Sequence, residues 1–118
     1  MYRKQLLLLI SLLVLGVCSA KDKNGQNIYG IGFYNLENLF DTCHDEGKND
    51  YEFLAEGSFK WTCEKYKAKL NNMARVLAEM GTDKLPGIGC AAIGVAEVEN
   101  AKCLVDLCNQ PVLKARNI

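Results

Sequence analysis

The sequence has 118 residues, of which 14 are basic and 14 are acidic, so its formal net charge is zero. This balance, with no cluster of basic residues, excludes a protein that binds nucleic acid mainly through a strongly positive surface. The six cysteines form no CxxC pair and no zinc-ligand spacing. We therefore predict neither a zinc module nor a disulfide framework, and expect Cys90 and Cys103 to be small core residues.

The first twenty residues have the order of a secretory signal peptide. Two basic residues near the start precede an almost wholly apolar run from Leu6 to Val17, and small residues follow up to Ala20. The apolar run is shorter than the roughly 20 residues of a membrane-spanning helix. We expect residues 1–20 to be removed from a secreted or periplasmic protein. Attachment to the outer membrane through a lipid on Cys18 is the alternative, which the bulky Val17 disfavours.

The remaining residues, 21–118, carry 12 basic and 14 acidic side chains. Their first predicted element is a buried strand at Asn27–Tyr34, where β-branched and aromatic residues are interrupted by glycines. Residues 41–60 are rich in Asp, Glu, Gly, Asn and Ser and hold no period, which indicates a loop. The only histidine, His44, lies in this loop, in a stretch that departs from the EF-hand pattern, and we expect it to be solvated.

A helix is predicted from about Thr62 to Met80, because apolar residues recur there at steps of three and four. Its predicted apolar face consists of Cys63, Tyr66, Leu70, Met73, Ala74, Leu77 and Met80. Gly81 is expected to end the helix. We expect Tyr66, and Trp61 just before the helix, to pack in the core and not to form a platform on which bases stack.

A second strand is predicted at Ile88–Val98, and Asn100 is expected to cap a last helix at Ala101–Cys108. The order strand, loop, helix, strand, helix predicts an α/β fold with two parallel strands and a right-handed crossover. Because parallel sheets occur almost only with both faces covered, we expect this βαβα portion to be the incomplete front part of a larger domain.

The two predicted strands end in polar residues. Asn35 follows the first strand, and Glu97, Glu99 and Asn100 follow the apolar run Ala92–Ala96 in the second. Ligands of open α/β sheets gather at the carboxyl ends of the strands, so we expect Asn35 and Glu97 to meet there. A carboxylate beside a neutral amide suits Mg²⁺, so we predict Glu97 and Asn35 both as metal ligands and as catalytic residues. Taken singly, each residue has another interpretation: a turn or cap residue for Asn35, and a solvated side chain for Glu97.

Four stretches, FYNLENLFDT, EGSFKW, KYKAKLNNMARVL and GVAEVEN, together resemble the endonuclease/exonuclease/phosphatase superfamily, and in particular its secreted bacterial members. The resemblance covers about residues 28–118. It implies that residues 21–118 are the N-terminal part of a deoxyribonuclease-like α/β sandwich. It also implies that Asn35 is the active-site asparagine and that Glu97 binds the metal, while Glu37 matches a position where some members carry a second acidic residue.

The resemblance implies a hydrolase that depends on Mg²⁺ or Mn²⁺ and cuts a phosphate ester of a nucleic acid, a nucleotide, a phospholipid or an inositol phosphate. In the family, a later Asp-x-Asn pair and an Asp-His pair complete the site, so we expect the 118-residue chain to hold half a site and to be inactive. We predict no stable protein partner, and membrane contact only through a lipid on Cys18. The alternative is a secreted binding or structural module that has no catalytic activity.

Overall fold

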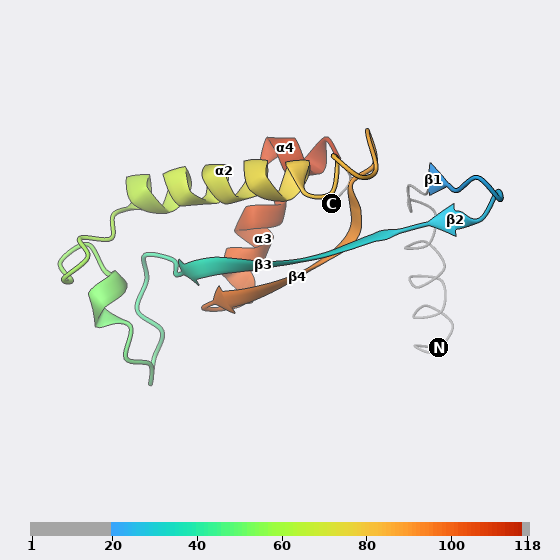
Figure 1. The fold of residues 1–118 in the computed structure, drawn as a ribbon. Helices are drawn as coiled ribbons and strands as arrows, with labels where there is room; N and C mark the ends of the chain where they lie inside the picture. Colours follow the sequence, from blue (N-terminus) through green and yellow to red (C-terminus); the bar gives the residue numbers. More distant parts are fainter. Residues whose placement is uncertain (1–19, 117–118) are drawn as a thin grey trace, which may run out of the picture.

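The computed structural model describes residues 20–116, so the predicted signal peptide lies outside the described residues except for Ala20. The centre of the fold is a parallel sheet formed by β3 (Gly30–Leu39) and β4 (Cys90–Val98) (Figure 1). Helices α2 (Cys63–Glu79) and α3 (Ala101–Cys108) pack against one face of this sheet, and α4 (Pro111–Lys114) packs against α2. The predicted α/β class and the parallel pairing are confirmed. Within the described range, no helix has both the length and the apolar character needed to cross a bilayer.

A short antiparallel hairpin precedes the sheet and projects away from it (Figure 1). Its strands are β1 (Ala20–Lys21) and β2 (Asn27–Ile28), with Ala20 opposite Ile28. The Oδ1 atom of Asp22 holds the turn by accepting two backbone N–H groups, those of Asn24 and Gln26, both at 2.8 Å. The single strand predicted at 27–34 is therefore divided at Tyr29, and its second part continues to Leu39.

Helix α2 has the bounds that the sequence predicts to within one residue. Thr62 is its N-cap and accepts the N–H of Lys65 at 3.4 Å, and Gly81 takes a φ of 76° just beyond its end. The buried side chains of α2 are Tyr66, Leu70, Ala74, Leu77 and Ala78. Cys63 was expected on the apolar face but is exposed, because it lies in the first turn, beyond the part of α2 that covers the core.

The core joins this helix to the end of β3 and to the C-terminal helices. Leu36 and Leu39 of β3, Cys103 and Leu107 of α3, and Leu113 of α4 are all at most 2% exposed. Asn100 caps α3 as predicted, by accepting the N–H of Cys103 at 3.0 Å. The sequence patterns did not indicate α4. The five cysteines of the described part are free thiols, with Cys103 buried and Cys90 half-buried.

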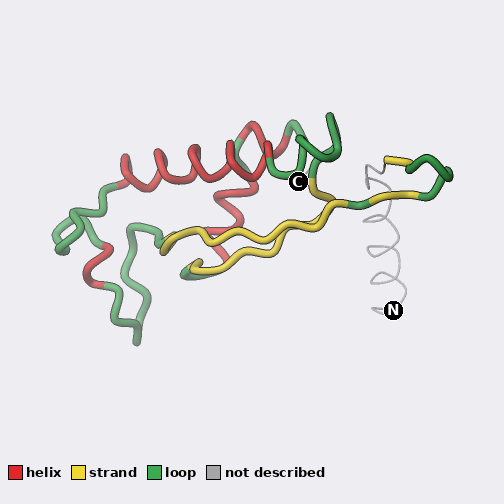
Figure 2. The backbone as a smooth tube through the Cα atoms, in the orientation of Figure 1, coloured by secondary structure: helices red, strands yellow, loops and turns green. Residues whose placement is uncertain are grey.

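The connection between β3 and α2 is loop except for one helical turn, η1 (Tyr51–Phe53) (Figure 2). Its centre is Asp50, which is only 2% exposed and accepts the N–H of Asp45 at 2.8 Å as well as a hydrogen bond with Nδ1 of His44. The backbone N–H of Asp45 and the contact with His44 hold the pKa of Asp50 below its usual value. The prediction of a solvated His44 is therefore only partly right, because one side of its ring is bound to Asp50.

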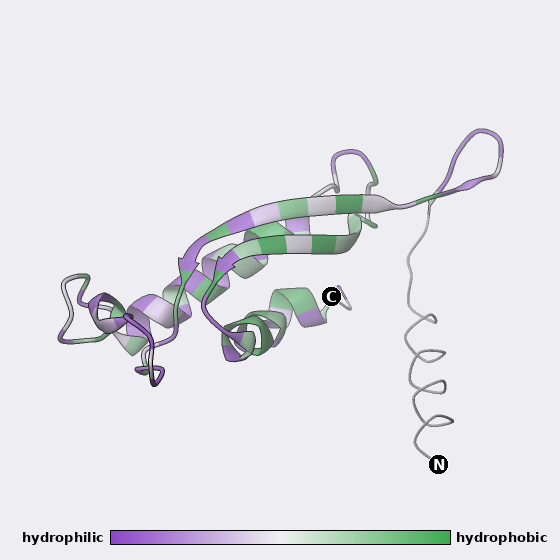
Figure 3. Ribbon diagram, turned by 90° about the horizontal axis from the view of Figure 1, so that it is seen from below, coloured by the Kyte–Doolittle hydropathy of each residue, from purple (hydrophilic) through white to green (hydrophobic). Residues whose placement is uncertain are grey.

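The face of the sheet that lies away from the helices is uncovered in residues 20–116. Figure 3 shows hydrophobic stretches along both strands. Ile31 and Phe33, two positions apart on β3 and therefore on the same face, are 83% and 71% exposed. The ring of Phe33 lies over Gly94 of β4, where a Cβ atom would come within 2.8 Å of it. A contiguous apolar surface of this kind is typical of an interface or of a site of aggregation.

Residues 21–118, expressed without the predicted signal peptide, should therefore self-associate and bind an apolar dye. The double substitution Ile31→Ser with Phe33→Ser should reduce both effects, as measured by light scattering and dye fluorescence. Val105→Ser is the matched control, since Val105 is a 57% exposed apolar residue on α3. A soluble monomer that binds no dye and unfolds in one sharp thermal transition would contradict this expectation.

Candidate active site at the carboxyl ends of the parallel strands

The regular pairing of β3 and β4 is interrupted at their carboxyl ends. Asn35 is paired with Ala96 and Leu39 with Val98, so three residues of β3 face the single residue Glu97 of β4. Such a bulge bends the strand and redirects its side chains. Leu36, which opens the bulge, is fully buried and anchors it in the core.

Three non-glycine residues at this bulge adopt left-handed backbone conformations. Their φ angles are 51° for Glu37, 58° for Asn38 and 57° for Glu97. A single left-handed residue other than glycine costs on the order of 1 kcal/mol or more, and such residues are concentrated at active sites and binding sites. The occurrence of three such residues at one edge of the sheet makes this edge the candidate functional site.

The structure brings Asn35 and Glu97 together at this edge. The Nδ2 atom of Asn35 donates to Oε1 of Glu97 at 2.8 Å, and its Oδ1 atom accepts the backbone N–H of Glu37 at 2.7 Å. Both side chains are exposed, so the carboxylate is fixed in orientation yet open to solvent. The expected meeting of the two residues is confirmed.

Lys69 of α2 also belongs to this edge, although no sequence pattern indicated it. Its ammonium group donates to the backbone carbonyl of Glu37 and, at 3.3 Å, to that of Asn38. Partial burial lowers the pKa of Lys69, while the charges of Glu37 and Glu97 act in the opposite direction. Lys69 directly precedes the buried Leu70 on the helix, and only the three-dimensional packing shows that it reaches the strand ends.

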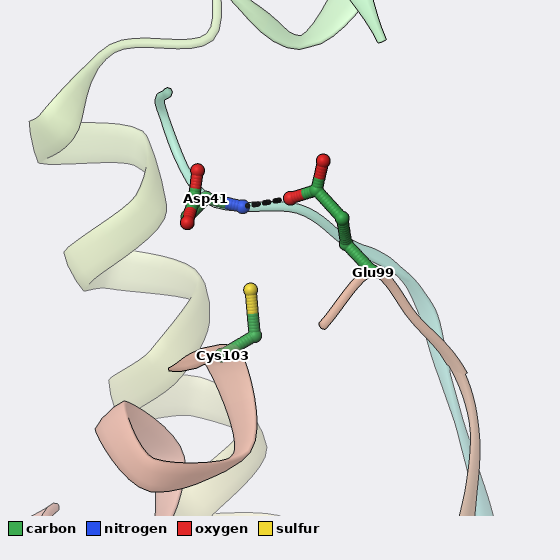
Figure 4. Close-up of side chains that lie close together, drawn as sticks. All are labelled: Asp41, Glu99 and Cys103. Atoms are coloured by element: carbon green, nitrogen blue, oxygen red, sulfur yellow. Dashed lines mark hydrogen bonds between the residues drawn. The ribbon is translucent and has the colours of Figure 1, made fainter. Parts of the chain in front are cut away.

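A second cluster of polar groups lies between β4, α3 and the loop after β3 (Figure 4). Its members are Asp41, Glu99 and Cys103, whose potential ligand atoms all lie within 4.8 Å of one another. The Oε2 atom of Glu99 accepts the backbone N–H of Asp41 at 2.9 Å, while Oε1 is buried without a hydrogen-bond partner. Asn100 donates to the carboxylates of Asp41 and Asp45 at 3.5 and 3.2 Å.

Burial is the main cause that raises the pKa of Glu99 above its usual value, and the carboxylates of Asp41, Asp45 and Asp50 act in the same direction. Burial likewise raises the pKa of the Cys103 thiol. This environment favours a protonated acid and a protonated thiol. The cluster therefore differs from the exposed Asn35–Glu97 pair, and its visible role is to attach the loop to the end of β4.

A groove of about 310 Å³ adjoins the Asn35–Glu97 pair through Glu37 and Asn38. Its remaining lining residues are Phe53, Phe59, Trp61, Lys65 and Lys69. Trp61 is half-buried and donates from Nε1 to the carbonyl of Phe40 at 2.9 Å, and Tyr66 is buried. The prediction that Tyr66 packs in the core is confirmed, whereas Trp61 packs against the core and also lines the groove.

The raised pKa of Glu99 has a direct consequence for stability. The folded protein binds the proton of Glu99 more tightly than the unfolded chain does, so its contribution to stability is greatest at acid pH and is lost as the pH rises through the folded-state pKa. Glu99→Gln should therefore raise the thermal midpoint at neutral pH and change it little near pH 4.

The measurement is thermal unfolding at both pH values, with Glu64→Gln on the exposed surface of α2 as the control. A Glu99→Gln protein that is less stable than the wild type at neutral pH, and only when a divalent cation is present, would instead make Glu99 a metal ligand.

Comparison with known protein families gives one match, to the Endonuclease/Exonuclease/phosphatase family over residues 30–118. Comparison with curated proteins and with solved structures gives no match. The matched range begins at the first residue of β3 and contains both strand ends, α2 and the two C-terminal helices. The strand-end asparagine and glutamate, the parallel pairing and the family match agree: the chain belongs to the endonuclease/exonuclease/phosphatase family.

Proposed function

We propose that this protein is a phosphoesterase that depends on a divalent metal and whose active centre is built around Asn35 and Glu97. The family acts on phosphate esters, and its members are nucleases and phosphatases. The observation that carries the proposal is the 2.8 Å hydrogen bond between Asn35 and Glu97 at the strained carboxyl ends of β3 and β4. Ligands of open α/β sheets bind at this edge.

The donors at this edge suit Mg²⁺ or Mn²⁺ better than the donors of the second cluster do. Glu97 offers an exposed carboxylate, the hard oxygen ligand that these ions prefer, together with room for several waters. The cluster of Asp41, Glu99 and Cys103 includes a buried thiol, a soft ligand that Mg²⁺ does not favour. A bound ion at Glu97 would supply charge neutralisation at the phosphoryl group and help to generate the attacking hydroxide.

Asn35 has the geometry of a hydrogen-bond donor more than that of a metal ligand. Its Oδ1 atom is engaged by the N–H of Glu37, and one hydrogen of its amide group is used to fix Glu97. The second amide hydrogen is free to donate to a phosphate oxygen. Lys69, fixed to the carbonyls of Glu37 and Asn38, adds a positive charge beside the same position. Glu37 supports this arrangement through its backbone.

We further propose that residues 21–118 form the N-terminal part of the catalytic domain and that residues 1–20 direct export. The single histidine, His44, is bound to Asp50 in the loop, which leaves the groups that activate the attacking water to another part of the domain. The product would be secreted or periplasmic, or held at the outer membrane by a lipid on Cys18.

Substitution of the two central residues should abolish most of the activity. In the full-length enzyme, Asn35→Ala removes a preorganised donor to a developing anion and should lower turnover by about 10²–10³. Glu97→Gln should cost at least as much, because it removes the ligand itself. Phosphate-ester hydrolysis is the measurement, with Glu64→Gln as the matched surface control.

The 118-residue chain by itself should show no turnover. Hydrolysis by this chain at a rate that disappears with EDTA would show that no further groups are needed. Full activity of the Asn35→Ala enzyme would remove Asn35 from the site.

The metal should bind through Glu97 and not through Glu99. In calorimetric titrations with Mn²⁺, Glu97→Gln should weaken binding at least tenfold, whereas Glu99→Gln should leave it unchanged. Unchanged binding in Glu97→Gln with loss in Glu99→Gln would move the ion to the second cluster, and would favour a non-catalytic module in which a cation supports the loop.

A further inference from the structure

We propose that the groove beside the strand ends binds an unpaired nucleobase of the substrate, with the ring of Phe59 as the stacking surface. This inference rests on the proposed function, because it names the substrate class of the same site. The groove and the Asn35–Glu97 pair share the bulge: Glu37 lines the groove and its N–H holds Asn35. A base in the groove would therefore belong to a nucleotide whose phosphate lies at the strand ends.

The rings of Phe53 and Phe59 in the wall of the groove extend a short row of aromatic rings that has one free end. The rings of Phe40 and Phe53 stack with centroids 3.9 Å apart and planes within 9°, and the ring of Phe59 follows at 5.0 Å with a tilt of 42°. Phe40 directly follows β3, so the stack starts from the sheet. Phe59 ends it and is 52% exposed, which leaves ring surface for a further planar group.

The backbone around Phe59 is held in place. The N–H of Phe59 donates to the carbonyl of Glu52 at 3.2 Å, and the N–H of Trp61 donates to that of Leu54 at 3.0 Å. At Gly57, between these bonds, a Cβ atom would come within 2.2 Å of the carbonyl oxygen of Tyr51. The loop thus closes tightly on η1, which fixes the backbone that carries the ring of Phe59.

Two lysines complete the groove with positive charge. Lys65 and Lys69 lie one turn apart on α2 and therefore on the same side of the helix. The ammonium of Lys65 donates to the carbonyl of Phe59 at 2.9 Å, and that of Lys69 lies 5.7 Å from the centre of the Trp61 ring. Aromatic surfaces beside basic groups bind single-stranded nucleic acid, in which bases stack and phosphates meet the cations.

The same features disfavour the other substrates of the family. Aromatic rings can bind a choline headgroup, but here the two ammonium groups of Lys65 and Lys69 outnumber the single carboxylate of Glu37, so the charge of the lining disfavours a cation. An inositol phosphate offers hydroxyl groups, which the polar side chains of the groove could bind but which would leave the rings of Phe53, Phe59 and Trp61 without an apolar partner. The groove volume of about 310 Å³ lies at the lower end of the range of about 300–1,000 Å³ for ligand pockets, which suits a single base.

The test compares ligands that differ by the base alone. In calorimetric titrations with EDTA present, adenosine 5′-monophosphate should bind the full-length protein at least tenfold more tightly than ribose 5-phosphate. Phe59→Ala should remove this difference, and Phe59→Trp should retain it. Tyr51→Ala is the matched control, because Tyr51 is 58% exposed on the same loop but stacks on His44 and does not line the groove.

Three results would overturn the proposal. The first is equal binding of adenosine 5′-monophosphate and ribose 5-phosphate by the wild type, and the second is tighter binding of phosphocholine or inositol 1-phosphate than of adenosine 5′-monophosphate. The third is equal competition with adenosine 5′-monophosphate by a blunt duplex and by a single strand. The Glu97→Gln protein should keep its preference for the nucleotide, which separates base binding from catalysis. If hydrolysis requires Asn35 and Glu97 but its rate is unchanged by Phe59→Ala on all substrates, the phosphoesterase is sustained and the base site is rejected. Base binding without hydrolysis would sustain the base site and reject the phosphoesterase.

Discussion

The bulge in which Leu36, Glu37 and Asn38 of β3 face Glu97 alone is the constraint on which the candidate site depends. In a regular parallel ladder, Asn35 and Glu97 would lie on neighbouring strands, but their side chains would not be held in contact with each other. The bulge turns the amide toward the carboxylate and exposes two backbone carbonyls, which Lys69 binds. The buried Leu36 and the pairing of Leu39 with Val98 hold the strained residues between two fixed points.

Sequence reasoning identified the elements that follow local periodicity. The apolar spacing from Tyr66 to Leu77 defines α2, because a helix of 3.6 residues per turn brings those side chains to one face. Asn100 was recognisable as a cap, since its side chain satisfies an N–H that lies only three residues away. The meeting of Asn35 and Glu97 also followed from the sequence, because parallel strands end at the same edge of a sheet.

Other features had no local signal. Left-handed backbone conformations are expected at glycine and, less often, at asparagine, so the residue types of Glu37 and Glu97 gave no indication of the bulge. Lys69 looked like any solvated lysine, and its role depends on how α2 crosses the strand ends. The pairing of His44 with the buried Asp50, and the stack from Phe40 to Phe59, are contacts within a loop that holds no period. Each of these features depends on contacts between residues that are distant in the sequence or that lie in an irregular loop.

The hairpin of β1 and β2 contains the bond at which the proposed signal peptide would be removed. Under the proposed cleavage after Ala20, the bond to be cut joins the two residues of β1, which pair with Asn27 and Ile28. A peptidase needs this backbone free and extended, and a ladder of two residue pairs is too short to be stable in water. Under that proposal the hairpin would be open when the bond is cut and would lose Ala20 afterwards, whereas the pairing of β3, which begins at Gly30, with β4 does not involve these residues. Maturation and folding of the sheet need not compete for the same segment of chain.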